Sequence, residues 1–442
     1  MRTLGQRRNV TEDFILPTLL FTSLGGMTWA VRGCSGYGGM AGGLFAGVTW
    51  GTAWWFIARE PGPTQSRLYH SGWIILALAV GFAVSGNRGW MQWPTFFEGR
   101  LQTNTPKGEF VPIPRSYGFI WLFIAGVPWA GIGACLLAWC AAGRVMRIRD
   151  LILRLAIAMG SAFLARIVFD NFPQLILPLY HSLSLKYADL SANPNLRRLI
   201  NDSRNAIMHL GFYLGCLGFE IARRDWKSTI LILTVGLVNG LGWALLQNWT
   251  WAKATWPAAS FNFWRCWESS AGMSIGLGYG LAYYLVNRRM SDEERSLTPT
   301  GLNNAHPDLE RFGAYLGLLL GLGVSFKSGL KGWANIYVGN EGYWNIVLWK
   351  VIGPVLAIAL LALVAWLRLR PTPRGLQGDL FPHAYGLVWG VVITQNVLAQ
   401  LVTGPWSAWN EVAFSLYYLL LFALCGVIIY YFGCMRAYGV VP

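Results

Sequence analysis

Two glutamates follow tryptophan-rich segments and stand where long uncharged stretches begin. Glu268 ends the segment WRCWE, and Glu411 ends the segment WSAWNE. Glycoside hydrolysis typically needs two carboxyl groups, one protonated as the acid and one ionised as the nucleophile or base. Apolar surroundings favour a protonated carboxyl group, and a neighbour such as Arg265 favours an ionised one. We therefore expect Glu268 and Glu411 to be the catalytic pair, with Asp202 and Asp170 in reserve.

Aromatic side chains near these glutamates alternate with amides and guanidinium groups. Aromatic rings pack on the C–H faces of sugars, and amide and guanidinium groups hydrogen-bond to hydroxyls. The interfacial belt of a membrane protein explains part of the 24 tryptophans, but not this alternation. The expected substrate-binding residues are Arg32, Asn87, Arg88, Trp90, Trp93, Arg166, Arg204, His209, Gln247, Asn248, Trp249, Trp264, Arg265, Trp267, Lys327, Trp333, Gln395, Asn396 and Trp409.

A plainer interpretation stands beside each of these expectations. Polar side chains within helices also join neighbouring helices by hydrogen bonds. Glu268 at a helix start would complement the helix dipole without any catalytic role. Lys327 and the arginines add a preference for a ligand with an anionic group.

The cysteines and histidines show no spacing typical of a metal or haem site. The seven cysteines form no CxxC motif, and the five histidines are scattered. We expect no metal and no cofactor.

The composition is that of a membrane protein. Of the 442 residues, 54% are hydrophobic and 12% are charged, about half the charged share of a soluble domain. Uncharged stretches such as 116–142 and 412–433 are near the roughly 20 residues that cross a bilayer as a helix. The net charge of +15 lies largely in short loops and therefore does not indicate nucleic acid.

Apolar stretches predict an all-α membrane protein with about twelve transmembrane helices in six helical hairpins. The predicted spans are 14–31, 38–58, 70–86, 116–142, 151–170, 203–222, 229–246, 269–286, 312–327, 344–367, 383–400 and 411–433. Alternate connections are rich in Arg and poor in aromatic residues, which places them and both termini in the cytoplasm. This prediction divides the chain into a cytoplasmic N-terminus (1–13), hairpins one to four (14–287), a cytoplasmic linker (288–311), hairpins five and six (312–434) and a tail (435–442).

A repeated pair marks the outer end of every odd-numbered span, where a Gly is followed six residues later by Arg, Lys or Asn. The pairs are Gly26/Arg32, Gly81/Asn87, Gly160/Arg166, Gly242/Asn248, Gly321/Lys327 and Gly390/Asn396. Repeated hairpins of one orientation close most simply into a ring. The pattern therefore predicts a toroid resembling an (α/α)6 barrel, with the polar residues at one depth around a central cavity.

The glycines of GYGGMAGGLFAGVTWG (36–51) recur every four residues. This small-xxx-small pattern indicates close helix packing. The lysine and the threonine or serine of a phosphate-binding loop are missing, which excludes that alternative.

Three functions remain open from these residues. The first is a membrane-embedded, glycoside hydrolase-like enzyme acting on a carbohydrate or glycolipid at the outer face of a plasma (inner) membrane. The second is a multi-pass transporter or channel for a polar, anionic solute, and the third is a non-catalytic subunit of a membrane complex. The expected partners are membrane lipid and a polar small molecule or glycan, but no nucleic acid.

Overall fold

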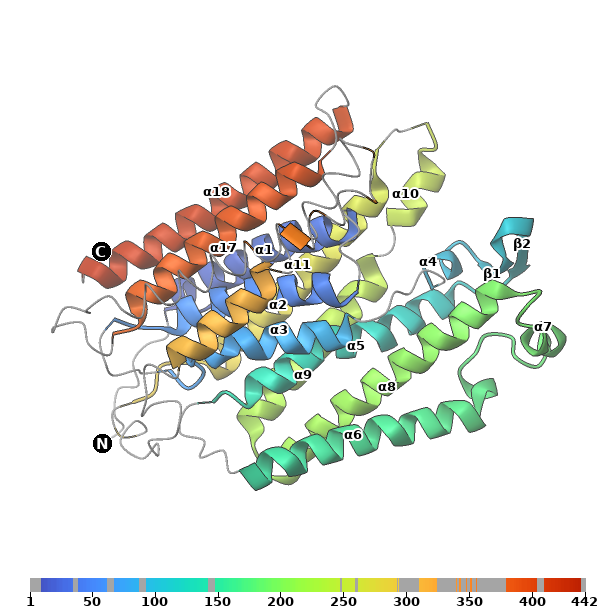
Figure 1. Cartoon of the computed structure of the whole chain (residues 1–442), viewed down its shortest axis with the longest axis horizontal. Coiled ribbons are helices and arrows are strands. Elements are labelled where there is room, and N and C mark those ends of the chain that lie inside the picture. The colour runs from blue at the N-terminus through green and yellow to red at the C-terminus, as the bar shows by residue number, and fades with distance from the viewer. Residues whose placement is uncertain are drawn as a thin grey trace.

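The chain folds almost entirely into helices (Figure 1). The computed structural model describes residues 9–34, 39–61, 67–86, 93–141, 148–246, 249–258, 261–291, 310–323, 379–403 and 409–438, with single positions between 293 and 355. The longer helices are α1 (Leu16–Cys34), α2 (Met40–Ala58), α3 (Trp73–Ser85), α5 (Ser116–Ala138), α6 (Ile148–Asn171), α8 (Pro194–Ala222), α9 (Trp226–Leu246), α11 (Phe263–Val286), α17 (Phe381–Val402) and α18 (Trp409–Tyr438). The prediction of an all-α protein is confirmed.

Short elements connect these helices. They are the π-helical turn Thr11–Ile15, the helices α4 (Trp93–Phe96), α7 (Ser184–Ala188) and α10 (Trp249–Thr255), the 3-10 turns Thr105–Lys107 and Pro173–Leu175, and the antiparallel strands β1 (Arg100–Asn104) and β2 (Glu109–Pro112). Gly108 takes a left-handed conformation in the turn between the strands. Asn104 and Thr105 hydrogen-bond to Ala192 and Asn195, which fastens this hairpin over the start of α8.

Within the described part of the chain, four helices are long and apolar enough to cross a membrane, by length and composition. They are Ser116–Ala138, Arg149–Asn171, Trp226–Leu246 and Trp409–Met435. The side chains of Met159, Phe163 and Leu164 on α6 are more than 60% exposed. An apolar face of this kind needs a cover other than water. These findings indicate a membrane protein.

Six helices form a closed circuit in which each packs against the next, in the order α1, α2, α3, α5, α9 and α11. The pair α6 and α8 packs on the α5 and α9 side of this circuit, and the pair α17 and α18 packs on the α1 and α2 side. Figure 1 shows the two pairs at opposite edges of the molecule.

The interior of the circuit is filled by one aromatic ring from each helix. The six residues are Trp29, Trp50, Phe82, Trp129, Trp243 and Tyr279. Their ring centroids lie 5.0 to 6.3 Å apart and the side chains are 0 to 3% exposed. The indole of Trp50 donates to the carbonyl of Phe21, and the hydroxyl of Tyr279 donates to the carbonyl of Ala130. The side chains of Trp50 and Tyr279 therefore also join their own helices to the backbone of another helix.

Glycines bring neighbouring backbones into contact around the circuit. On α2, Gly43, Gly47 and Gly51 face the backbone of α3, and a Cβ atom at Gly51 would lie 2.7 Å from Ile75 Cα. On α11, Gly272, Gly276 and Gly280 face α1 in the same way. The predicted close packing by the row of glycines is thus confirmed on α2.

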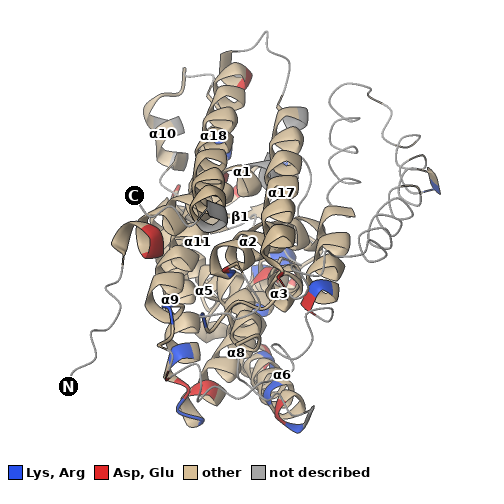
Figure 2. Cartoon of the chain, turned by 90° about the vertical axis from the view of Figure 1, so that its left-hand side faces the viewer, with Lys and Arg blue, Asp and Glu red and all other residues tan. Residues whose placement is uncertain are grey.

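Charged residues join the helix ends where α1 begins and α18 ends. Arg59 pairs with Glu310 at 3.1 Å, Arg67 with Asp13 at 2.8 Å, and Arg289 with Glu60 at 2.8 Å. Arg289 lies at the start of the predicted linker 288–311, which is attached here to the loop after α2. Figure 2 views this end of the molecule.

The predicted spans and the observed helices coincide over most of the described chain, but several helices start earlier. The helix predicted at 269–286 starts at Phe263, because the side chain of Asn262 accepts the backbone N–H of Arg265 and caps it. The helix predicted at 203–222 starts at Pro194, a residue favoured in the first helical turn. The span 344–367 lies largely outside the described residues.

The six Gly/polar pairs do not share one environment. A Cβ atom at Gly81 would overlap Gly133, whereas those at Gly160 and Gly390 would meet nothing within 4 Å. The side chain of Arg166 is 51% exposed, and Asn396 is 8% exposed. The four other polar members lie outside the described side chains. The observed circuit is closed by six single helices, whereas the predicted ring is closed by six helical hairpins. The six-hairpin toroid therefore stays a prediction.

We predict that Gly276→Ala destabilises the protein and that Gly160→Ala does not. A methyl group at Gly276 would overlap the backbone of Phe21, and such overpacking costs about 1–3 kcal/mol. A methyl group at Gly160 meets open space, where alanine improves helix propensity by up to about 1 kcal/mol. Thermal unfolding in detergent measures both variants. Equal midpoints for the two would contradict backbone contact between α1 and α11.

Candidate functional site

The starts of α11 and α18 meet through an ion pair. The guanidinium of Arg265 lies 2.8 Å from the carboxylate of Glu411 and 4.9 Å above the ring of Phe414. The Arg265 side chain is 7% exposed and that of Glu411 is 16% exposed. The backbone N–H of Asn262 also donates to the side chain of Asn410, which joins the N-cap of α11 to the first turn of α18. Residues 146 positions apart are thereby brought to one place.

Glu268 lies one helical turn beyond Arg265 on α11, so the two side chains project from the same side of that helix. Glu268 is 4% exposed. It stands past the first turn of α11, whereas Glu411 lies in the first turn of α18. The helix-dipole interpretation therefore applies to Glu411 better than to Glu268.

Hydroxyl groups extend this cluster toward α1. Ser269 donates to the carbonyl of Gly26 at 3.1 Å and shares a hydrogen bond of 2.7 Å with the hydroxyl of Tyr417. Arg265, Glu268, Ser269, Glu411 and Tyr417 are called the α11/α18 cluster below. It combines two carboxyl groups, a guanidinium and two hydroxyls near the starts of the apolar helices α11 and α18.

The reserve carboxylates belong to a different group, at the ends of α6 and α8. Asp170 pairs with Arg204 at 2.8 Å and with Arg166 at 3.3 Å. Asp202 is 7% exposed and lies 3.7 Å from Arg198. This group sits on the pair of helices opposite α17 and α18, so the structure separates Asp170 and Asp202 from the α11/α18 cluster.

The nearby carboxylate of Asp189 is exposed and serves the turn before α8. It accepts hydrogen bonds from the hydroxyl and backbone N–H of Ser191 and from the backbone N–H of Ala192. These bonds, that from the hydroxyl first, lower the pKa of Asp189 below its usual range. Asp189 is therefore poorly suited to act as a general acid.

The expected aromatic ligands differ in exposure. Trp409 is 74% exposed, and Trp249 and Trp264 are 38% exposed, so all three can offer a ring face. Trp93 and Trp267 are 2% and 0% exposed. Trp93 stacks on Trp121, and Trp267 lies against Trp264. Trp93 and Trp267 therefore serve packing in this structure.

The two amides of α17 that were expected to bind a ligand join helices. The Gln395 side chain donates to the carbonyl of Leu24 at 2.8 Å, and the Asn396 side chain donates to the carbonyl of Tyr418 at 3.2 Å. Both residues are buried. His209 instead lines an apolar groove between α3, α5, α6 and α8.

The remaining expected ligands fall outside the described side chains. Arg32 lies in α1, but its side chain is not described, and the others are Asn87, Arg88, Trp90, Gln247, Asn248, Lys327 and Trp333. Among the residues that are described, no group of three or more His, Cys, Asp and Glu side chains could hold a metal ion.

Sequence patterns missed Ser269 and Tyr417. Ser269 directly follows Glu268 inside an uncharged stretch, and Tyr417 lies six residues after Glu411 in another. The spacing of Phe414 and Tyr418 after Glu411 follows one helical face, and this spacing signals in the sequence that this side of α18 is buried.

No protein-family pattern, curated protein or solved structure matches this chain.

We predict strong coupling between Arg265 and Glu411 in a double-mutant cycle. Arg265→Met alone leaves a largely buried carboxylate without its cation, a change that costs about 3–5 kcal/mol for a buried pair. Adding Glu411→Leu restores part of this stability. The control pair is Arg100 and Glu98, whose side chains are 46% and 35% exposed and whose coupling should be about 0–1 kcal/mol. Additive losses at Arg265 and Glu411 would show that the pair is not a unit.

Proposed function

We propose that the protein is a membrane-embedded enzyme that hydrolyses a carbohydrate or glycolipid in the α11/α18 cluster. The observation that carries this proposal is the Arg265–Glu411 ion pair. It holds Glu411 beside the turn of α11 from which Glu268 projects. Paired carboxyl groups with different surroundings are the chemical requirement of glycoside hydrolysis.

The two glutamates have different roles in this proposal. Glu411 accepts a charge-assisted hydrogen bond from Arg265 and acts as the ionised nucleophile or base. Glu268, which is 4% exposed, acts as the acid. It donates its proton to the glycosidic oxygen as the C–O bond breaks, while Glu411 or a water that it deprotonates attacks the sugar carbon.

Exposed aromatic rings beside the cluster suit the substrate. Trp264 precedes Arg265 by one residue, and Trp409 precedes Glu411 by two. Their exposed rings are platforms for the C–H faces of a sugar, and Asn262 and Asn410 offer amides to its hydroxyls.

We place the protein in the plasma (inner) membrane as a multi-pass protein of twelve spans, with the cluster facing outside or the periplasm. The start of α1 and the end of α18 lie at the same end of the molecule (Figure 1). An even number of crossings and the Arg-rich connections support a cytoplasmic position for both.

Transport of a polar, anionic solute is the second candidate. Gln395 is fully buried within α17, and the Arg59–Glu310 ion pair lies near the start of that helix. Buried polar groups therefore occur at two levels along α17, as a path for a polar solute would require. Six aromatic rings fill the described interior of the helical circuit, which argues against a path through its centre. The enzyme is therefore the proposal that the geometry supports better.

We expect the purified wild-type protein in detergent to cleave at least one member of a panel of glycans and glycolipids, and Glu268→Gln to lose at least about 100-fold in rate. Mass spectrometry follows the products. Glu98→Gln is the matched control, because Glu98 is an exposed carboxylate in the turn before β1, paired with Arg100. It should retain the wild-type rate.

Flux assays in liposomes distinguish the two candidates. Solute uptake without any cleavage would replace the enzyme by a transporter. Cleavage that survives Glu268→Gln would keep the enzyme but remove Glu268 from its mechanism.

A further inference from the structure

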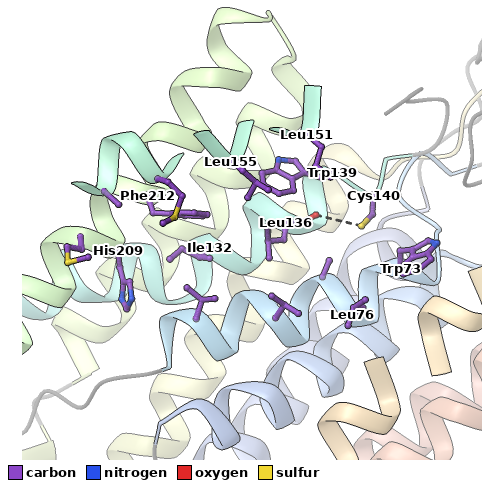
Figure 3. Close-up of a pocket in the computed structure, with 16 residues that line it drawn as sticks. Trp73, Leu76, Ile132, Leu136, Trp139, Cys140, Leu151, Leu155, His209 and Phe212 are labelled. Atoms are coloured by element: carbon purple, nitrogen blue, oxygen red, sulfur yellow. Dashed lines mark hydrogen bonds between the residues drawn. The ribbon is translucent and has the colours of Figure 1, made fainter. Parts of the chain in front are cut away.

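A groove with a volume of about 870 Å³ lies between α3, α5, α6 and α8. Figure 3 shows His209 at one end of it and Trp73 and Cys140 at the other. The lining between these ends consists of aliphatic, aromatic and methionine side chains, such as Leu136 and Leu155. The groove lies on other helices than the α11/α18 cluster, so its role is independent of the function proposed above.

The groove extends along two helices. It runs along α3 from Trp73 to Val84 and along α6 from Leu151 to Ala162. Eleven residues of helix rise about 17 Å, which is close to half of a hydrocarbon core of about 30 Å. An apolar groove of this length matches a hydrocarbon chain within one leaflet of a bilayer.

One wall of the groove becomes charged beyond its apolar part. On α6, Leu155, Met159 and Ala162 line the groove, and the same face continues after one and two turns to Arg166 and Asp170. The side chains of Arg166 and Asp170 are 51% and 35% exposed, so this end of the face is open.

The neighbouring helix α8, which packs on α6, changes in the same direction. On α8, Phe212 and His209 line the groove, and Asn205 follows one turn nearer the start of the helix. Arg204, beside Asn205, pairs with Asp170 at 2.8 Å and thus joins α8 to α6. Arg166 and Arg204 therefore share the single carboxylate of Asp170, and Arg198 lies 3.7 Å from Asp202 nearby.

We propose that this groove binds the hydrocarbon chain of one membrane lipid, whose phosphate-containing headgroup lies against Arg166 and Arg204. The apolar lining takes the chain, and the two guanidinium groups that share the carboxylate of Asp170 leave one positive charge for an anionic headgroup. His209 places one polar side chain at the junction of the two parts. Because the groove spans about half of the hydrocarbon core, the lipid is a bilayer phospholipid and not a polyprenyl phosphate with its longer chain.

The test uses the full-length protein, stripped of lipid in detergent and titrated with phosphatidylglycerol, phosphatidylethanolamine or a polyprenyl phosphate. Native mass spectrometry counts the bound molecules. We expect one saturable site with at least about tenfold preference for the anionic lipids over phosphatidylethanolamine. Phosphatidylglycerol should bind most tightly, and tighter binding of the polyprenyl phosphate would contradict the assignment of a bilayer phospholipid.

Two pairs of variants test the two parts of the groove. Met159→Trp and Val80→Trp fill the groove from opposite walls, whereas Leu164→Trp changes an exposed residue of α6 that does not line it. The first two should weaken binding of every lipid about tenfold, and the third should leave it unchanged. Arg166→Gln and Arg204→Gln should remove the anionic preference, with Arg197→Gln, an exposed arginine of α8, as their control.

Several results would overturn the proposal. Binding that does not saturate, or that survives both tryptophan substitutions in the groove, would show annular lipid only. An anionic preference that is absent from the wild type, or that persists in both arginine variants, would remove the headgroup site.

Discussion

Backbone contact between helices at glycine is the constraint on which the rest of this structure depends. In hydrocarbon the backbone polar groups are satisfied within each helix, and close packing must hold the helices together. Gly25 and Gly272 face one another between α1 and α11, as do Gly81 and Gly133 between α3 and α5. These backbone contacts fix the distances between neighbouring helices and thereby the width of the six-helix circuit. One large ring from each helix then fills its interior, so the many glycines and many aromatic residues of this chain are parts of one packing solution.

Much of the fold could be predicted because it depends on local composition. Uncharged stretches place the helices, and glycines four residues apart place the contact face of α2. Helix starts were less predictable, since Asn262 caps α11 by accepting one backbone N–H, an interaction that a hydropathy pattern does not contain. Arg265 and Glu411 were both expected in one site, and the ion pair brings their side chains together, whereas their roles in binding and catalysis stay predictions.

The sequence could not predict which aromatic and polar side chains are buried between helices and which are exposed and free to bind a ligand. It depends on the rotation of each helix about its axis, which spacing along the chain does not reveal. Gly160 and Gly81 occupy equivalent places in the predicted repeat, yet one faces open space and the other faces a neighbouring backbone. For the same reason Trp267 is buried, whereas Trp264, three residues earlier, is partly exposed. Gln395, expected to bind a ligand, instead donates to the backbone of α1.

The two proposed catalytic glutamates stand on helices that are held in different ways. Glu268 belongs to α11, whose backbone contacts α1 through Gly272 and Gly276. Glu411 belongs to α18, which meets Gly26 of α1 through the side chains of Tyr417 and Leu421. Side-chain contacts adjust more readily than backbone contacts, so the Arg265–Glu411 pair is what sets the position of the second carboxylate relative to the first. That separation decides the outcome of the reaction, because retaining enzymes hold their carboxyl groups about 5 Å apart and inverting enzymes leave about 6.5–9.5 Å for a water. In the proposed reaction Arg265 is therefore a positioning residue, because its pairing with Glu411 sets the separation on which the proposed stereochemistry depends.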